Sequence, residues 1–480
     1  MGKWTVGIGL LIITAGCAST PPIQPLRLAT ALPATWMAAD VPVGQIDSEW
    51  WNDFEDPGLS IVVASALERN YDLQAAAARL EQAAADARIA SANLQPTVQA
   101  SYAGSRRKQN FVGFPIPGSE GRVLSTISTN QGVSLDVSWE LDLWSRVQAN
   151  TQGALADLQR SAADLRGAQL SLAGQTVKAW FAIAESQQQV DLSEQTVKSF
   201  RESAGIVRER FEAGIRPALD LRLALLNLSN AEAVLQQRHQ QLDATTRQLE
   251  VLLGEYADGT IGTPAALQTV PPAIPGGLPA ELVARRPDLL AAERQVAAAA
   301  ARLRVAHKDL LPRITLTAAT GAATDSLTNL INGDFTVWSI FGQLVAPIWQ
   351  GGRLRAQVSR AEARAAEALA IYANTALRAY AEVETTLAAE ALLEKQEGHR
   401  ATSVEQARAA ERLANERYLA GLETYITVLD SQRSAMQAEV DLIATRRLRL
   451  ENRVDFYLVL GGGFDQLEAP FDLGRIENEN

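Results

Sequence analysis

The feature that most constrains the fold of this 480-residue chain is an internal duplication. Residues 69–73 (RNYDL) resemble residues 285–289 (RRPDL), 216 positions later, and residues 209–214 (ERFEAG) resemble residues 416–421 (ERYLAG), 207 positions later. Repeats of this length predict two copies of one supersecondary arrangement. Each copy is expected to contain a helix, a proline break, two strands joined by a loop, a long helix, a hairpin turn and a second helix.

Long helices are expected to make up most of each copy. Residues 146–213 and 354–420 contain no proline and are rich in Ala, Gln, Leu and Arg, which mostly favour helix. At about 1.5 Å per residue, each stretch predicts a helix of roughly 100 Å, which is too long for a compact domain. Gly214 and Gly421 follow these stretches in the position of helix C-caps. The chain is therefore expected to turn back at both glycines and to form helix hairpins.

Alternation with a period of two predicts four strands. Residues 127–143 place apolar side chains at odd positions and polar, partly acidic ones at even positions, and a shorter alternation precedes them at 97–103. The second copy alternates at 313–320 and continues at 335–346. Residues 106–125 hold prolines and glycines and are expected to form a long loop. A soluble half-buried hairpin and a lipid-facing sheet would show the same pattern, so alternation alone does not decide between them.

Four strands are too few to close a barrel, because the smallest membrane barrels have about eight. An open sheet edge is not tolerated in hydrocarbon. If the strands face lipid, several copies of the chain must therefore combine them.

The N-terminus predicts export. Lys3 precedes an apolar stretch at 6–15, and small residues lead directly to Cys17. This stretch is too short to cross a bilayer but fits the apolar part of a signal peptide. The spacing resembles a bacterial lipobox, so we expect a lipoprotein signal peptide at 1–16 and a lipidated N-terminus at Cys17. An ordinary signal peptide with an incidental cysteine is the alternative.

Composition and motifs argue against several classes of function. The net charge of −11 is unfavourable for binding nucleic acid, which requires a basic surface. One cysteine and three widely separated histidines do not form a metal-ligand pattern. The glycine-rich phosphate-binding motifs and the nucleophile elbow are missing. We therefore expect neither an enzyme nor a bound cofactor or metal.

Four groups of residues, in order along the chain, resemble the TolC-like outer-membrane efflux protein family, in its NodT-type lipoprotein branch that serves resistance–nodulation–division (RND) transporters. They are Trp50, Trp51, Phe54, Asp56, Pro57 and Leu59; Leu278 and Pro279 with Arg285, Arg286, Pro287 and Asp288; Tyr418 to Gly421 with Val428, Leu429, Asp430, Ser431 and Gln432; and Leu460 to Phe464.

This resemblance implies a mixed α and β membrane protein that works as a homotrimer. Three copies would pool their four transmembrane strands into a shared 12-stranded trimeric β-barrel, and their long helix hairpins into a periplasmic α-barrel tunnel. The expected divisions are a signal peptide at 1–16, a lipid-anchored Pro-rich leader at 17–57, a first structural repeat at 58–275, a second repeat at 276–464 and a C-terminal tail at 465–480.

The implied function is the outer-membrane exit duct of a tripartite efflux pump, which conducts small molecules such as drugs or metal ions without catalysis. Its expected partners are outer-membrane lipid, a periplasmic adaptor protein and an inner-membrane RND transporter. The duct would close where the hairpins converge, at Asp220, Arg222, Tyr418, Glu423, Thr427 and Asp430. Each charged residue fits equally well as a solvated side chain near a helix start, and Tyr418 as a packing residue between hairpins.

Two other functions compete with the duct. An exported coiled-coil lipoprotein, acting as a spacer or adhesin, would explain the seven-residue repeats but not the duplicated strand pairs. An exported hydrolase would need a nucleophile or metal constellation that the sequence does not show. Within the duct hypothesis, a duct for protein secretion is the remaining variant.

Overall fold

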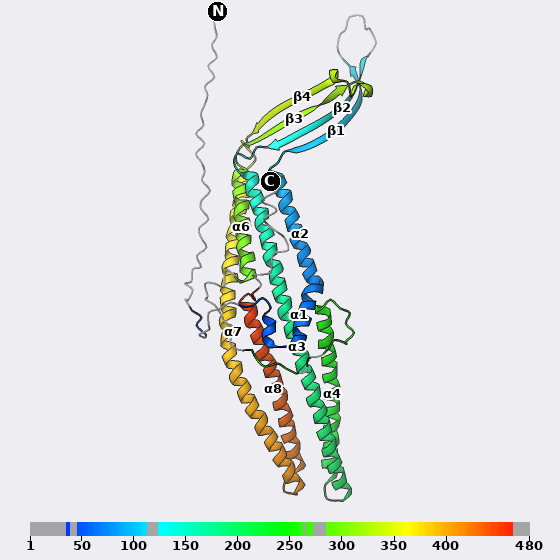
Figure 1. Ribbon diagram of the computed structural model, residues 1–480, viewed down its shortest axis with the longest axis vertical. Coiled ribbons are helices and arrows are strands. Elements are labelled where there is room, and N and C mark those ends of the chain that lie inside the picture. The colour runs from blue at the N-terminus through cyan, green and yellow to red at the C-terminus, as the bar shows by residue number, and fades with distance from the viewer. Residues whose placement is uncertain are drawn as a thin grey trace, which may run out of the picture. The chain divides into compact units, whose positions relative to one another are not determined.

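The computed structural model of the chain describes residues 35–38, 46–112, 123–262, 264, 266–271 and 285–463 (Figure 1). The predicted signal peptide, Cys17, Leu278, Pro279, Phe464 and the tail at 465–480 lie outside these residues. The chain divides into two compact units. One contains Leu94–Asn150 and Ala299–Ala365, and the other contains the described helical segments within 46–93, 151–298 and 366–463. Each unit therefore draws on both halves of the sequence.

The element order confirms the internal duplication. The first series is α2 (Tyr71–Ala92), β1 (Thr97–Phe111), β2 (Leu124–Glu140), α3 (Arg146–Glu212) and α4 (Ala218–Leu252), and the second is α6 (Pro287–Lys308), β3 (Arg313–Thr324), β4 (Thr336–Val345), α7 (Arg353–Leu419) and α8 (Tyr425–Val459). Corresponding helices have equal lengths: 22 residues in α2 and α6, 67 in α3 and α7, and 35 in α4 and α8. The predicted long helices and hairpins are thereby confirmed. None of the described helices combines the length and the apolar character needed to cross a membrane.

The four strands form one antiparallel sheet in the order β1-β2-β3-β4. Its register places Tyr102 opposite Val133 and Trp139 opposite Leu316, so apolar side chains share one face. Many of these side chains, Tyr102, Val133 and Trp139 among them, are exposed in the single chain. Within the described residues, β1 and β4 each pair along one side and leave the other edge open.

The expectation of a loop across 106–125 is wrong at both ends. Strand β1 pairs with β2 from Thr97 opposite Ser138 as far as Phe111 opposite Leu124. Residues 105–110 (SRRKQN), the outer part of β1, are polar on both faces of the strand, because neither face is buried there. Backbone pairing alone makes this segment a strand, and such pairing leaves no alternation in the sequence.

The tryptophan-rich segment before α1 (Pro57–Arg69) docks on the helices through an aromatic cluster. The short 3-10 helix Trp50–Phe54 buries Trp50, whose ring stacks on Tyr457 of α8 at 4.8 Å, and Phe54, whose ring meets Phe181 of α3 at 5.1 Å. The Tyr457 hydroxyl donates to Asp53 at 2.5 Å. This cluster gives a structural reason for the first motif of the sequence: it holds the N-terminal segment against both repeats.

Candidate functional site: the hairpin turns

The two hairpin turns have the same backbone geometry. Gly214, between α3 and α4, and Gly421, between α7 and α8, have φ angles of +70° and +78°. The Gly214 N–H donates to the carbonyl of Phe211 at 2.9 Å, and the Gly421 N–H donates to that of Tyr418 at 3.0 Å. These are the left-handed C-caps expected from the sequence, and glycine suits them because it lacks a Cβ.

An aromatic residue at the end of α7 joins the two hairpins. Tyr418 is 2% exposed, and the guanidinium groups of Arg210 and Arg216 lie 5.3 and 4.7 Å from the centre of its ring. Arg210 also donates to the backbone carbonyls of Tyr418 at 3.2 Å and Leu419 at 2.9 Å. A cation of the first hairpin therefore adds hydrogen bonds to two carbonyls at the C-terminus of a second-hairpin helix, where the helix dipole favours positive charge.

A hydrophobic cluster continues this contact along the hairpins. Its buried members are Ala204, Val207, Ala224, Ala414, Tyr418, Tyr425, Val428 and Leu429. The rings of Tyr418 and Tyr425 are 5.4 Å apart, and the Tyr425 hydroxyl lies 3.1 Å from the Ser203 hydroxyl. Farther along, Arg433 donates to Asn227 at 2.6 Å. We call the eight buried members the tip cluster.

The hydroxyl of Tyr418 takes no part in this contact through hydrogen bonding. It is buried and has no hydrogen-bond partner among the described residues. Burial raises the pKa of Tyr418, and the nearby carboxylate of Asp220 adds to the effect against the opposing charges of Arg216 and Arg210. Tyr418 therefore contacts the first hairpin through its ring and its backbone carbonyl rather than through its hydroxyl.

Two other predicted gate residues form contacts inside the second hairpin. The Glu423 carboxylate accepts from the Thr427 hydroxyl at 3.1 Å and from the backbone N–H of Thr424 at 3.2 Å. Arg417 Nε lies 3.7 Å from the same carboxylate, and Arg216 donates to the Glu423 carbonyl at 3.5 Å. The side chains of Glu423 and Thr427 therefore stabilise the start of α8.

The other charged residues predicted at the gate, Asp220, Arg222 and Asp430, differ in how exposed they are. Asp220 is half-buried in the first turn of α4, close enough to Tyr418 and Tyr425 for its charge to act on both pKa values. Arg222 and Asp430 are exposed. Asp430 follows the buried Val428 and Leu429 but is itself exposed and is not a member of the tip cluster. The structure thus leaves Arg222 and Asp430 at the surface of the single chain and Asp220 half-buried at the start of α4.

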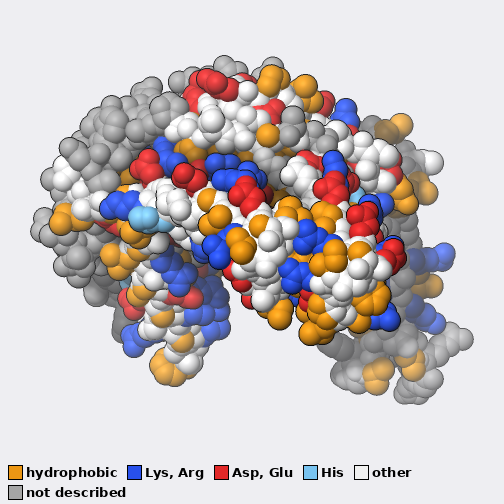
Figure 2. All heavy atoms as spheres, turned by 90° about the horizontal axis from the view of Figure 1, so that it is seen from below, with side chains coloured by type: hydrophobic (Ala, Val, Ile, Leu, Met, Phe, Trp, Pro, Cys, Tyr) orange, Lys and Arg blue, Asp and Glu red, His pale blue; other side chains and the backbone are white. Residues whose placement is uncertain are grey.

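Sequence reasoning missed Arg210, Arg216 and Tyr425, which carry much of the contact between hairpins. Arg210 lies inside the repeated motif ERFEAG/ERYLAG, so the duplication contained a signal for it. Viewed from below, the molecule presents hydrophobic side chains next to side chains of both charges (Figure 2). Exposed apolar residues of the turns include Phe211, Ile215, Leu219, Leu422 and Ile426.

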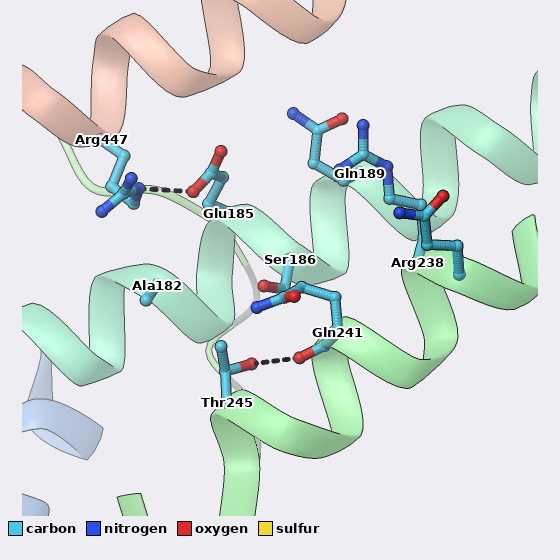
Figure 3. Close-up of a pocket in the computed structure, with 9 residues that line it drawn as sticks. Ala182, Glu185, Ser186, Gln189, Arg238, Gln241, Thr245 and Arg447 are labelled. Carbon is cyan, nitrogen blue, oxygen red and sulfur yellow. Dashed lines mark hydrogen bonds and ion pairs between the residues drawn. The ribbon is translucent and has the colours of Figure 1, made fainter. Parts of the chain in front are cut away.

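A polar cavity of about 340 Å³ lies between α3, α4 and α8 (Figure 3). Arg447 of α8 forms an ion pair with Glu185 of α3 at its wall, and Gln189 of α3 is buried beside it. The lining includes the hydroxyls of Ser186 and Thr245, and its one carboxylate, Glu185, is the partner of Arg447. Among the described residues, no cluster of three or more His, Cys, Asp or Glu side chains is arranged to bind a metal ion.

Comparisons with known proteins agree with this arrangement. A family model described as outer membrane efflux protein matches residues 62–255 and 278–462. The pyoverdine export outer membrane protein OpmQ of Pseudomonas putida is 32% identical over 455 residues, covering 94% of this chain and 96% of the relative. The outer membrane protein OprJ of Pseudomonas aeruginosa is 32% identical over 474 residues, covering 97% and 98%.

Solved structures show the same fold. The outer-membrane channel OprN superposes with a TM-score of 0.84 at 27% identity, covering 91% of this chain and 98% of that one. The open state of the MtrE outer membrane channel of Neisseria gonorrhoeae gives a TM-score of 0.79 at 27% identity, covering 92% and 98%.

Proposed function

This chain belongs to the outer membrane efflux protein family, and from that premise we propose that three copies assemble into the exit duct of a tripartite pump. The family resemblance, the mixed helical and strand fold, the outer-membrane location and the efflux function predicted from the sequence are confirmed by these relatives. The trimer, the gate, the lipid anchor at Cys17 and the identity of the partners are the finer parts of the proposal.

The observation that carries the trimer is the open sheet. Strands β1 and β4 have unpaired edges within the described residues, and the apolar face of the sheet is exposed. An unpaired strand edge is not stable in a lipid bilayer unless it pairs with the edge of another copy, whereas an exposed apolar face is suited to contact with lipid. Three sheets of four strands would close into one barrel of 12 strands, which lies within the range of membrane barrels.

The pump partners follow from what a passive duct requires. Members of this family are transport proteins, and a channel cannot drive export by itself, so energy has to come from a second protein. We assign that role to an inner-membrane RND transporter, joined to the duct by a periplasmic adaptor. Relatives named for pyoverdine, toluene and antibiotics indicate small-molecule cargo, while the cargo of this chain is set by its transporter.

The hairpin turns are the proposed gate. The contact between Tyr418 and the two arginines fixes one hairpin against the other within each protomer, so opening requires this contact to loosen. Asp430, exposed on α8, would form an acidic ring where three copies converge, and Asp220, Arg222, Glu423 and Thr427 would surround it. The tunnel is expected to favour cations at this constriction.

Reconstitution tests the proposal against the alternative of a coiled-coil spacer. The purified full-length lipoprotein is inserted into planar bilayers, and its assembly is followed on gels with and without heating. A duct gives heat-sensitive trimers and discrete conductance steps. A spacer or adhesin gives an elongated protein that leaves the bilayer non-conducting, and that result would refute the duct.

A further inference from the structure

The two hairpins are related by the 207-residue repeat in their contacts as well as in their sequence. Arg201 pairs with Glu232 at 2.9 Å across the first hairpin, and Arg408 pairs with Glu439 across the second. Both members of the second pair lie 207 positions after those of the first. The repeat therefore predicts which residues occupy corresponding places on the two hairpins.

Corresponding residues differ sharply in exposure at one place. Phe211 at the end of α3 corresponds to Tyr418 at the end of α7, and both precede the same glycine turn. Tyr418 is 2% exposed because Arg210 and Arg216 of the other hairpin cover it, whereas Phe211 is 38% exposed. An aromatic side chain at the repeat position of a buried one is thus left uncovered in the single chain.

The residue able to cover it is also uncovered. Arg417 corresponds to Arg210, and its side chain is 52% exposed, with Nε 3.7 Å from Glu423. Arg210 donates to the carbonyls of Tyr418 and Leu419, whose counterparts are the carbonyls of Phe211 and Glu212. The single chain therefore contains one complete contact between an arginine and an aromatic ring at these positions and, in Arg417 and Phe211, the two separated halves of a second. Glu423 stands at the repeat position of Arg216, so the second contact would involve one arginine rather than two.

We infer that the second contact forms between copies: Arg417 of the partner subunit lies over the ring of Phe211 and donates to the Phe211 and Glu212 carbonyls. Within one chain the first hairpin provides the arginine and the second the aromatic ring. If first and second hairpins alternate around a closed ring of copies, each second hairpin faces the first hairpin of the next copy. For the contact to repeat in the same direction around the ring, the second hairpin must provide the arginine and the first hairpin of the next copy the aromatic ring.

Charge complementarity favours a second copy as the occupant of this surface. In the tip cluster, Ala204 and Leu429 are both apolar and come from opposite hairpins. Their counterparts are Glu411 and Arg222, which have opposite charges and lie on the two faces that would meet between copies. Burial and nearby Glu439 raise the pKa of Glu411, and the charges of Arg408 and Arg412 offset this only in part. A further cation from a neighbouring copy would favour the charged form of this carboxylate.

Exposed apolar residues follow Phe211 in the first hairpin. Ile215 in the turn and Leu219 and Leu226 on α4 are exposed, and the exposed Arg222 lies between the two leucines at helical spacing. Exposed apolar groups clustered in this way mark surfaces that become covered. The inference rests on the proposed homotrimer and gives its tip contacts residue by residue.

Cysteine cross-linking of the full-length lipoprotein in outer-membrane vesicles tests the contact. The test variant is Phe211→Cys with Arg417→Cys, and the matched control is Tyr418→Cys with Arg210→Cys, the corresponding positions within one chain. Each is treated with a short bis-maleimide and run on a denaturing gel. We expect covalent dimers and trimers from the test pair and monomers from the control pair. Variants with only one of these substitutions, in which Cys17 is retained, should give no covalent dimers or trimers.

Three results would overturn the inference. The test pair could stay monomeric although unheated gels show intact trimers, which would leave the duct standing without this contact. Phe211→Cys alone could cross-link as well as the pair, which would indicate a symmetric contact between first hairpins. The wild-type protein could run as a monomer on unheated gels, in which case the proposed trimer fails together with the contact.

Discussion

Replacing Tyr418 separates the effect of its ring from that of its hydroxyl. In Tyr418→Ala the ring leaves a site that is 2% exposed, together with its contacts to Arg210, Arg216 and Tyr425. Deleting a buried aromatic side chain costs about 3–5 kcal/mol. In Tyr418→Phe the ring stays, and the hydroxyl that is lost has no hydrogen-bond partner among the described residues. That change is expected to be neutral or slightly stabilising, because a buried unpaired polar group is removed.

The magnitude decides what an electrical recording will show. If about 3 kcal/mol is lost from the closed arrangement alone, the closed-to-open equilibrium shifts by a factor of roughly 10², at about 1.4 kcal/mol per factor of ten. We therefore expect Tyr418→Ala to raise the open fraction of single channels in planar bilayers strongly. Tyr418→Phe should match the wild type, and heat-sensitive trimers should persist in both variants.

Two outcomes would refute this reasoning. Equal opening in the Phe and Ala variants would mean that the hydroxyl forms a hydrogen bond that only the assembled protein contains. Wild-type gating in Tyr418→Ala would mean that the contact between hairpins within a protomer does not hold the duct shut.

Other predictions address separate parts of the chain. Asp430→Ala should weaken block by a trivalent cation and reduce cation preference, most clearly at low salt, and unchanged block would place Asp430 outside the lumen. Cys17→Ala should abolish labelling with radioactive palmitate while strand insertion persists, and label retained in the variant would refute lipidation. Tyr457→Phe removes the hydrogen bond to Asp53 and should lower stability by about 1.5–3 kcal/mol, measured by denaturation, with Tyr71→Phe as an exposed control.

The sequence by itself determined the repeated architecture, because its signals are local. Freedom from proline defined the long helices, and glycine at 214 and 421 placed their ends, since these positions require a positive φ. Alternation placed the strands wherever one face of the sheet is apolar and the other polar. It failed for the outer part of β1, where both faces are polar and only backbone pairing maintains the strand.

Only the tertiary structure decided which of the repeated residues form the contact between hairpins. Phe211 and Tyr418 have the same local sequence signals, yet one is exposed and the other is buried. The difference comes from Arg210 and Arg216, about two hundred positions before Tyr418, which cover one ring and not the other. Burial depends on what packs against a residue, and packing between segments so distant in the chain leaves no periodic trace in either one.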